Sequence, residues 1–124
     1  MPSNDEMKAA MRAYVERLNA GDLDGIMALY ADDATVEDPV GADVRRGAAE
    51  IRAFYDQAVA SNAKLRIVGP QCGSAGGFAA MPIEVSVAPP GAPKMLIGAI
   101  ETMRFNDAGK IVEDCRKDEF FGNA

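Results

Sequence analysis

Three side chains of this sequence could share acid–base chemistry, and the most telling of them is Glu101. In a strand, alternate residues share one face. On the face that contains Glu101, the other residues are all apolar: Met95, Ile97, Ala99, Met103 and Phe105. A carboxylate is costly there, so Glu101 should have a raised pKa, a dedicated partner, or both. The alternative is a strand end or bulge that lets Glu101 reach solvent.

Tyr14 and Asp38 are predicted to point toward the same interior. Tyr14 lies on the apolar stripe of a predicted helix, so its ring faces inward and its hydroxyl needs a partner. A purely structural hydrogen bond would satisfy that need. Asp38 has the same strand parity as Val36 and should also face inward, unless it merely begins a turn before Pro39.

Together these residues describe an apolar pocket that contains two carboxyl groups and a phenol. Such a set suits removal of a proton next to a carbonyl, with neutral donors holding the enolate oxygen. The chain has no histidine, which argues against the usual zinc sites and against Ser–His or Cys–His nucleophile pairs. Acid–base chemistry must therefore rely on Asp, Glu, Tyr or Lys.

The composition is that of a soluble globular protein, and 124 residues fit a single domain over residues 1–124. The net charge of −6 argues against binding to nucleic acid or to an anionic membrane. The acidic first residues are unlike a signal peptide, and no apolar run is long enough to span a membrane. We therefore expect a cytoplasmic protein. Cys72 and Cys115 form no CxxC pattern and are predicted to be free thiols.

The first half of the chain has mainly helical patterns. Ser3 and Glu6 form a capping box that predicts a helix start, and Gly21 ends this helix. Asp22 can begin a second, shorter helix that reaches Tyr30. After a turn, a short strand stops at Pro39, and a third helix follows. The predicted apolar face of the third helix carries Ile51, Phe54, Tyr55 and Val59.

From about residue 64 the pattern has period two, which is typical of strands. The predicted strands are 64–68, 78–87, 94–106 and 110–120. Helices first and strands afterwards indicate an α+β fold. We expect a curved antiparallel sheet that, with three N-terminal helices, forms a conical barrel around an apolar pocket.

One segment carries a specific family resemblance. Residues 30–39, Tyr-Ala-Asp-Asp-Ala-Thr-Val-Glu-Asp-Pro, resemble the stretch that bears the general base of bacterial Δ5-3-ketosteroid isomerases. Tyr14 and the run 19–26 resemble the helix that bears the oxyanion-hole tyrosine of that family. Shorter matches occur at 53–55, 80–82 and 103–106. The resemblance covers about residues 8–112.

The resemblance implies cofactor-independent isomerisation of 3-oxo-Δ5-steroids to 3-oxo-Δ4-steroids through a dienolate. Asp38 matches the base that moves the proton, and Tyr14 matches the phenol that donates to the dienolate oxygen. Glu101 stands where the family usually has a protonated aspartate as second donor. Tyr30 and Tyr55 resemble tyrosines that support Tyr14. The residues that match the wall of the steroid cavity are Leu18, Phe54, Met81, Ile97 and Ala99.

The resemblance also implies a fold and partners. The family has the conical α+β fold of nuclear transport factor two-like proteins and usually forms a homodimer through the outer face of its sheet. The implied partner is a small hydrophobic ketone, with no metal, nucleic acid or membrane involved.

Two features depart from the family pattern. Glu101 is one methylene longer than aspartate, and a backbone shift or a folded rotamer must absorb this length. The last strand is highly charged where the family has an apolar and aromatic wall. In the simplest register Asp114 and Asp118 face the pocket. A register shift that brings Phe120 or Phe121 inward is the alternative.

Two other functions stay open. Related conical proteins act as polyketide cyclases or epoxide hydrolases, which also use carboxylates in a closed pocket. The charged last strand suits the smaller or more polar ligand of such an enzyme. The other possibility is a non-catalytic binding or dimerisation module that retains the pocket residues of an enzyme ancestor.

Overall fold

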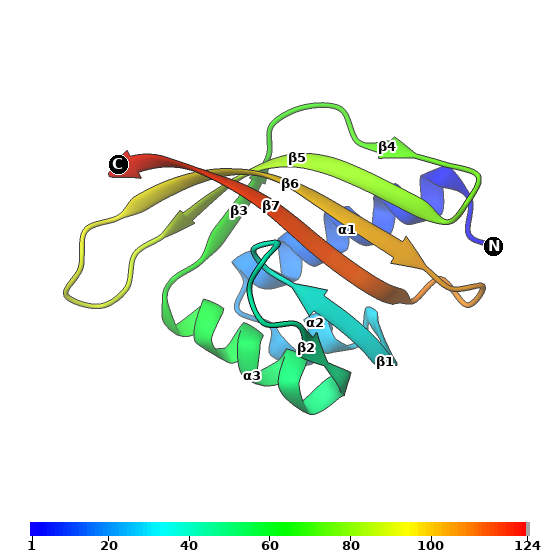
Figure 1. The fold of residues 1–124 in the computed structure, drawn as a ribbon, viewed down its shortest axis with the longest axis horizontal. Coiled ribbons are helices and arrows are strands. Elements are labelled where there is room, and N and C mark those ends of the chain that lie inside the picture. Colours follow the sequence, from blue (N-terminus) through cyan, green and yellow to red (C-terminus); the bar gives the residue numbers. More distant parts are fainter. Residues whose placement is uncertain (124) are drawn as a thin grey trace.

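In the computed structural model of the chain, a curved, open sheet wraps around helices (Figure 1). The structure describes residues 1–123, with side chains up to residue 118. Three helices and seven strands lie within residues 1–123. The helices are α1 (Asn4–Asn19), α2 (Leu23–Met27) and α3 (Gly47–Ala60). The strands are β1 (Tyr30–Glu37), β2 (Arg45–Arg46), β3 (Lys64–Ile67), β4 (Cys72–Gly73), β5 (Phe78–Val87), β6 (Met95–Phe105) and β7 (Ile111–Asn123). The predicted α+β class is confirmed.

Helix α1 begins and ends as the sequence predicts. The Ser3 hydroxyl accepts a hydrogen bond from the Glu6 backbone N–H, and the Ser3 N–H donates to the Glu6 carboxylate, which completes the capping box. Gly21 follows the helix with φ of 68°, a left-handed conformation that glycine adopts without steric cost. The buried face of α1 consists of Met7, Met11, Tyr14, Val15 and Leu18. This face places Tyr14 in the core.

Helix α2 is shorter than predicted. Asp22 caps it by accepting a hydrogen bond from the Gly25 N–H at 2.9 Å, but the helix ends at Met27. Tyr30 therefore belongs to β1, where its backbone pairs with Ile111. The turn predicted between the second helix and the first strand coincides with a register shift in β1, between Tyr30 and Thr35, rather than with a break in the strand.

The sheet has the strand order β2-β1-β7-β6-β5-β3, and β4 pairs with β5. Its pairs are antiparallel except for β1–β7, which is parallel. The prediction of an antiparallel sheet is therefore correct for every pair but this one. Helix α1 packs against β3, β4 and β5, while α3 packs against β1 and β2. The two helices and the sheet thus enclose the space in which the inward side chains of β5, β6 and β7 meet.

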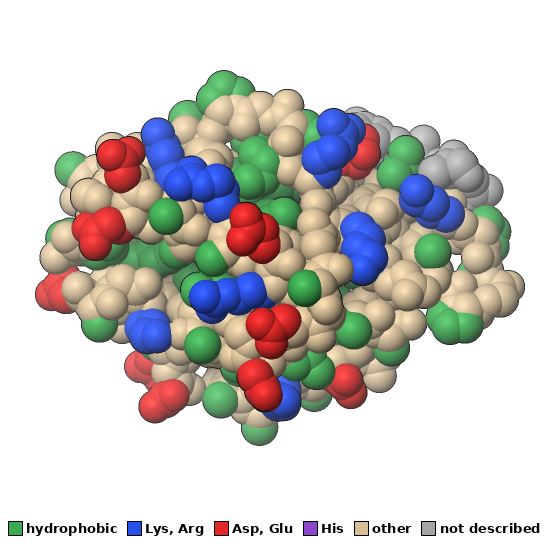
Figure 2. Space-filling view, turned by 180° about the vertical axis from the view of Figure 1, so that it is seen from behind, with side chains coloured by type: hydrophobic (Ala, Val, Ile, Leu, Met, Phe, Trp, Pro, Cys, Tyr) green, Lys and Arg blue, Asp and Glu red, His purple; other side chains and the backbone are tan. Residues whose placement is uncertain are grey.

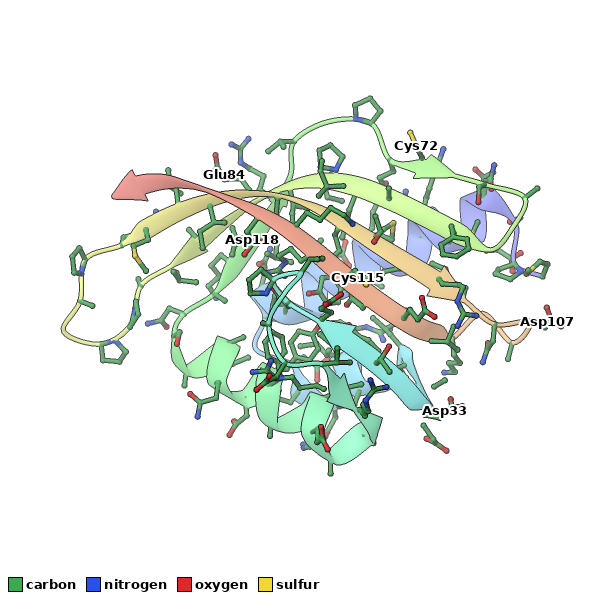
Figure 3. All side chains as sticks on the ribbon, viewed as in Figure 1. Asp33, Cys72, Glu84, Asp107, Cys115 and Asp118 are labelled. Atoms are coloured by element: carbon green, nitrogen blue, oxygen red, sulfur yellow. The ribbon has the colours of Figure 1, made fainter. Side chains whose placement is uncertain are left out.

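The predicted free thiols are confirmed, because Cys72 on β4 and Cys115 on β7 form no disulfide (Figure 3). Acidic and basic side chains are interspersed on the face of the molecule seen in Figure 2. In the described part of the chain, no helix combines the length and the apolar character needed to cross a membrane. The two-residue strands β2 and β4 are absent from the sequence prediction, since a period cannot be recognised over two residues.

Candidate active site

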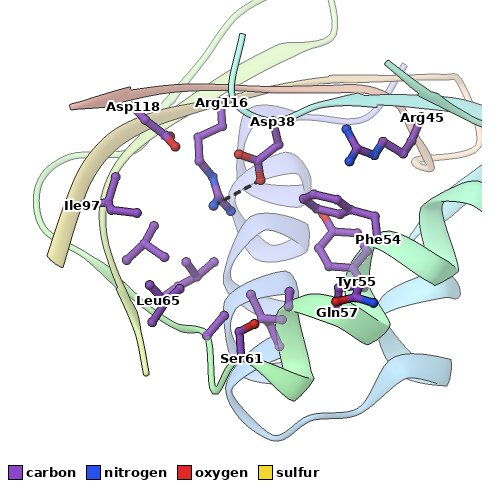
Figure 4. Close-up of a pocket in the computed structure, with 15 residues that line it drawn as sticks. Asp38, Arg45, Phe54, Tyr55, Gln57, Ser61, Leu65, Ile97, Arg116 and Asp118 are labelled. Carbon is purple, nitrogen blue, oxygen red and sulfur yellow. Dashed lines mark ion pairs between the residues drawn. The ribbon is translucent and has the colours of Figure 1, made fainter. Parts of the chain in front are cut away.

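A cavity of about 340 Å³ lies between α3 and the inner face of the sheet (Figure 4). Its volume is in the range of small-molecule sites. One side is apolar and includes Leu18, Phe54, Leu65, Val85, Val87 and Ile97. The other side carries four charged side chains, Asp118, Arg116, Asp38 and Arg45. A ligand of this cavity therefore meets an apolar surface and a row of charges at the same time.

Asp38 follows the last residue of β1 and points into the cavity (Figure 4). Its side chain is only 7% exposed. Burial raises the pKa of Asp38 to about 6, although the Arg116 guanidinium acts in the opposite direction. A carboxylate that titrates close to neutral pH at the wall of an apolar cavity is well suited to take up and return a proton.

Arg116 joins Asp38 to Glu101. Arg116 on β7 lies directly opposite Glu101 on β6, so their side chains extend from neighbouring positions on the inner face. The Arg116 Nε lies 3.0 Å from Glu101 Oε1, and Nη1 lies 3.1 Å from Asp38 Oδ2. Nη2 donates to the Tyr14 hydroxyl at 3.2 Å. All three nitrogens of this guanidinium are thus held by protein groups.

Glu101 is buried, with an exposed fraction of 1%. Burial raises its pKa well above the ordinary value, the neighbouring Asp114 carboxyl raises it further, and Arg116 lowers it. Glu101 therefore has both of the expected features, a raised pKa and a dedicated partner, Arg116. The apolar face predicted around Glu101 is also present, with Ala99, Met103 and Phe105 buried.

Three tyrosines form a hydrogen-bonded chain that begins at Tyr14, next to Arg116. The Tyr14 and Tyr55 hydroxyl oxygens are 3.1 Å apart, and those of Tyr55 and Tyr30 are 2.6 Å apart. Tyr30 donates to Asp114 Oδ2, and Tyr55 lies 3.3 Å from the same oxygen. Burial raises the pKa of each of these tyrosines well above its ordinary value. The tyrosines therefore stay protonated and can serve as neutral donors.

The buried cluster contains more acids than bases. Among the described side chains, Arg116 is a buried cation with the carboxyls of Glu101, Asp114 and Asp38 around it. Asp114 Oδ1 is buried and has no donor within the described residues. A proton on Glu101 would account for both the excess of carboxyls and the missing donor. It removes one negative charge, and it provides the donor that Asp114 Oδ1 lacks. Glu101 and Asp114 then share a hydrogen bond, consistent with the influence of Asp114 on the pKa of Glu101.

Glu101→Gln is expected to leave the free energy of unfolding at pH 7 within about 1 kcal/mol of the parent. Glutamine has the same shape as protonated glutamic acid, can accept from Arg116 and can donate to Asp114. Urea denaturation measures the free energy, and infrared spectroscopy at pH 7 should show a protonated-carboxyl band that the variant lacks. A loss of several kcal/mol, or no such band in the parent, would mean that Glu101 is ionised.

The predicted site residues occupy two layers. Asp38, Leu18, Phe54, Ile97 and Tyr55 contribute to the cavity wall. The remaining predicted residues do not line this cavity; they are Tyr14, Tyr30, Met81, Ala99 and Glu101. Met81 lies opposite Glu101 in the sheet, and Ala99 lies opposite Ile83.

The position of Tyr14 and Glu101 differs from the expectation that both face the substrate. Arg116 lies between these residues and the cavity, and it contacts both of them. The reason is the length and charge of the arginine, which reaches inward from β7 to meet Glu101 on one side and Asp38 on the other. In this structure the cation that pairs with Asp38 at the cavity wall is Arg116.

Sequence reasoning missed Arg116. The signal was present, because Arg116 has the same strand parity as Asp114 and Asp118, both of which were expected to face inward. The structure places Asp118 at the cavity wall and Asp114 deeper, beside Tyr30, as in the simplest register. Arg45, Gln57 and Ser61 of the wall were also missed.

The alternative of a register shift concerns Phe120 and Phe121, whose side chains lie outside the described residues. The backbone of β7 does shift register against β6 between Leu96 and Ile97. Within residues 1–118, no group of three or more acidic or cysteine side chains is arranged to hold a metal ion.

Residues 11–114 match the SnoaL-like domain. The chain belongs to this family. Over 106 residues, 86% of this chain and 84% of the relative, it is 35% identical to a steroid Δ-isomerase of Nocardioides simplex. The predicted membership of the ketosteroid isomerase family, within the nuclear transport factor two-like superfamily, is thereby confirmed.

Other relatives of this SnoaL-like protein have different activities. It is 30% identical over 110 residues to the epoxide hydrolase LasB of Streptomyces lasalocidi, covering 89% of this chain but only 39% of LasB. A solved structure of the epoxide hydrolase/cyclase-like enzyme SalBIII, which has a role in pyran ring formation in the polyether salinomycin, superposes with a TM-score of 0.86. The identity there is 26%, over 93% of this chain and 92% of SalBIII. These relatives are enzymes of one fold, which supports catalytic activity in this chain.

Proposed function

We propose that this protein isomerises a β,γ-unsaturated ketone, a 3-oxo-Δ5 steroid, to its conjugated 3-oxo-Δ4 isomer. The observation that carries this proposal is Asp38, a nearly buried carboxylate with a pKa of about 6 at the wall of an apolar cavity. The 35% identity to a steroid Δ-isomerase over most of both chains supports it.

The reaction is an internal proton transfer that needs no cofactor. The Asp38 carboxylate removes a proton from C4, next to the carbonyl, and the electron pair moves to the ketone oxygen to give a dienolate. Asp38 then returns the proton to C6. Arg116 is the cavity-facing donor beside Asp38, so we assign it the stabilisation of the dienolate oxygen.

Tyr14 and Glu101 take part through Arg116 in this proposal. Both contact the guanidinium and neither lines the cavity, so they position the donor that meets the substrate. Tyr55 in turn donates to Tyr14, and Tyr30 is hydrogen-bonded to Tyr55. Substrate contacts are proposed for Leu18, Phe54 and Ile97 in the wall, whereas Met81 and Ala99 do not line this cavity. A homodimer formed through the outer face of the sheet and a cytoplasmic location remain predictions.

A second candidate is the opening of an epoxide by a water or an internal hydroxyl. The specific observation in its favour is that two carboxyls, Asp38 and Asp118, line the cavity on either side of Arg116 (Figure 4). Burial raises the pKa of both groups. One could protonate the epoxide oxygen while the other removes a proton from the nucleophile. LasB and SalBIII support this candidate.

Two parallel assays separate the candidates. The first follows the ultraviolet absorbance of the conjugated enone formed from 5-androstene-3,17-dione. The second follows ring closure of a hydroxy-epoxide by mass spectrometry and chromatography. Turnover of the ketone alone supports the isomerase, and turnover of the epoxide alone supports the second candidate. Binding of equilenin, a phenolic mimic of the dienolate, without turnover in either assay would indicate a binding module.

The isomerase activity should depend on pH through Asp38. Because the base must be ionised, kcat/KM should fall about tenfold per pH unit below pH 6, which a profile between about pH 4 and 8 would show. A raised pKa in the folded state means that folded protein binds this proton more tightly than unfolded protein. The contribution of Asp38 to stability should therefore decrease as pH rises from about 4 to 6. A flat kcat/KM profile down to pH 5 would contradict the assignment.

A further inference from the structure

Arg45 is a cation of the cavity wall that the proposed mechanism does not use. It lies on β2, at the same side of the cavity as Asp38 and next to Phe54 of α3 (Figure 4). Its guanidinium carbon is 5.1 Å from the centre of the Phe54 ring, a cation–π contact. Its Nη1 donates to the Asp43 carbonyl at 2.6 Å. These two contacts hold the guanidinium beside Phe54 at the cavity wall.

The guanidinium of Arg45 differs from that of Arg116 in its partners. Arg116 is held by Asp38, Glu101 and Tyr14. Arg45 has no carboxylate within 4.0 Å among the described residues. Since an arginine has five N–H donors in a planar fork, most donors of Arg45 remain for a ligand. A planar, two-oxygen anion is the group that such a fork binds best.

The charges along the cavity give such a ligand a direction. Asp118, Arg116, Asp38 and Arg45 follow one another along one side (Figure 4). An anion is attracted to Arg45, which acts on Asp38 only through longer-range attraction and forms no direct ion pair with a described carboxylate, and is repelled from the end that carries Asp118. The apolar part of the same ligand can lie against Leu65 and Ile97.

We propose that Arg45 binds a carboxylate of the substrate, so that the preferred substrate is a 3-oxo-Δ5 steroid that also carries an acid group, and a neutral steroid ketone is turned over but bound more weakly. This inference rests on the proposed function, because it assumes that the same cavity holds the reacting group of the substrate next to Asp38. It names the chemical class of the substrate and gives Arg45 the role of a specificity residue. A neutral ligand of the same shape binds the apolar wall equally but leaves Arg45 unused.

The test compares a matched pair of probes, 2-naphthoate and 2-naphthamide, which share an apolar ring and differ in charge. We expect isothermal titration calorimetry at low salt to give at least about tenfold tighter binding of the acid, because charge-assisted hydrogen bonds are the strong ones. In Arg45→Met the two probes should bind equally. Arg45→Lys should keep part of the preference, since it keeps the charge without the fork.

Arg46→Met is the matched control, because Arg46 is the neighbouring residue of β2 but is exposed and outside the cavity wall. It should leave the preference for the acid unchanged. Equal binding of acid and amide to the parent protein, no binding of the acid, or a preference that survives in Arg45→Met would each overturn the proposal. Neither probe can be isomerised, so this binding experiment does not depend on catalysis. If the proposed isomerase activity is wrong, the enone assay shows it, whereas the binding experiment tests Arg45 alone.

Discussion

Asp38→Asn is expected to lower kcat for the isomerisation by about a hundred- to ten-thousandfold, the contribution typical of a positioned general base. Asparagine has nearly the same size as aspartate but cannot accept the proton. The variant should still bind equilenin, because the apolar wall is unchanged. Steady-state kinetics with 5-androstene-3,17-dione and a binding titration with equilenin measure the two effects separately.

The stability of Asp38→Asn provides a check that the loss is chemical. Burial raises the pKa of Asp38 although Arg116 lowers it, so the ionised carboxylate is less stable in the folded protein than in water. The free energy of unfolding of the variant at pH 8 should therefore equal or exceed that of the parent. A variant that retains more than a tenth of the parent kcat would remove Asp38 from the role of base.

Asp118→Asn distinguishes the two candidate reactions. Asp118 lines the cavity but has no step in the isomerisation, so ketone turnover should change little. In epoxide opening it is one of two carboxyls that act as acid and base, and its loss should be as severe as that of Asp38. The ratio of the two losses, measured with each substrate, thus reports which reaction the cavity supports.

The face of Glu101 could be predicted from sequence because strand alternation is local. Every second residue of β6 must share a face, and the apolar neighbours of Glu101 show which face is inside. The capping box of α1 is equally local, since Ser3 and Glu6 are three residues apart. The order of helical and strand patterns along the chain predicted a cone, and the family resemblance implied the same fold.

The neighbours of Glu101 could not be predicted in the same way. The contact with Arg116 requires the exact pairing of β6 with β7, and the contact of Arg116 with Asp38 requires the parallel pairing of β1 with β7. Both pairings join strands whose register depends on the whole sheet. The resemblance also implied that Tyr14 and Glu101 donate directly to the ligand. In the structure the side chain of Arg116 lies between these two residues and the cavity, so a ligand contacts Arg116 instead.

Arg116→Met is expected to destabilise the protein by about 3–5 kcal/mol at pH 8, the usual cost of removing one partner from a buried charge network. Methionine fills much of the same volume, so the loss reports charge rather than a cavity. The carboxyls of Asp38 and Glu101 would lose a guanidinium at 3.1 Å and 3.0 Å. Urea denaturation measures the change.

The loss in Arg116→Met should be smaller at pH 5 than at pH 8. Without the cation, the pKa of Asp38 moves further upward, so protonation of Asp38 at low pH relieves its uncompensated charge in the folded state. Combining Arg116→Met with Glu101→Gln should not add the full losses of the two single variants, because the residues are in contact. A loss below about 1 kcal/mol at pH 8 would show that the cluster does not depend on Arg116.

Catalysis should suffer independently of stability. If Arg116 holds the dienolate oxygen, kcat should fall by about a hundred- to a thousandfold in Arg116→Met, with the assay run under conditions where the variant is folded. Arg116→Lys keeps the charge but cannot contact Asp38, Glu101 and Tyr14 at once, so it should recover stability more than rate. If lysine restored both equally, Arg116 would act as a structural counter-ion, and the oxyanion donors would have to be Tyr14 and Glu101 themselves.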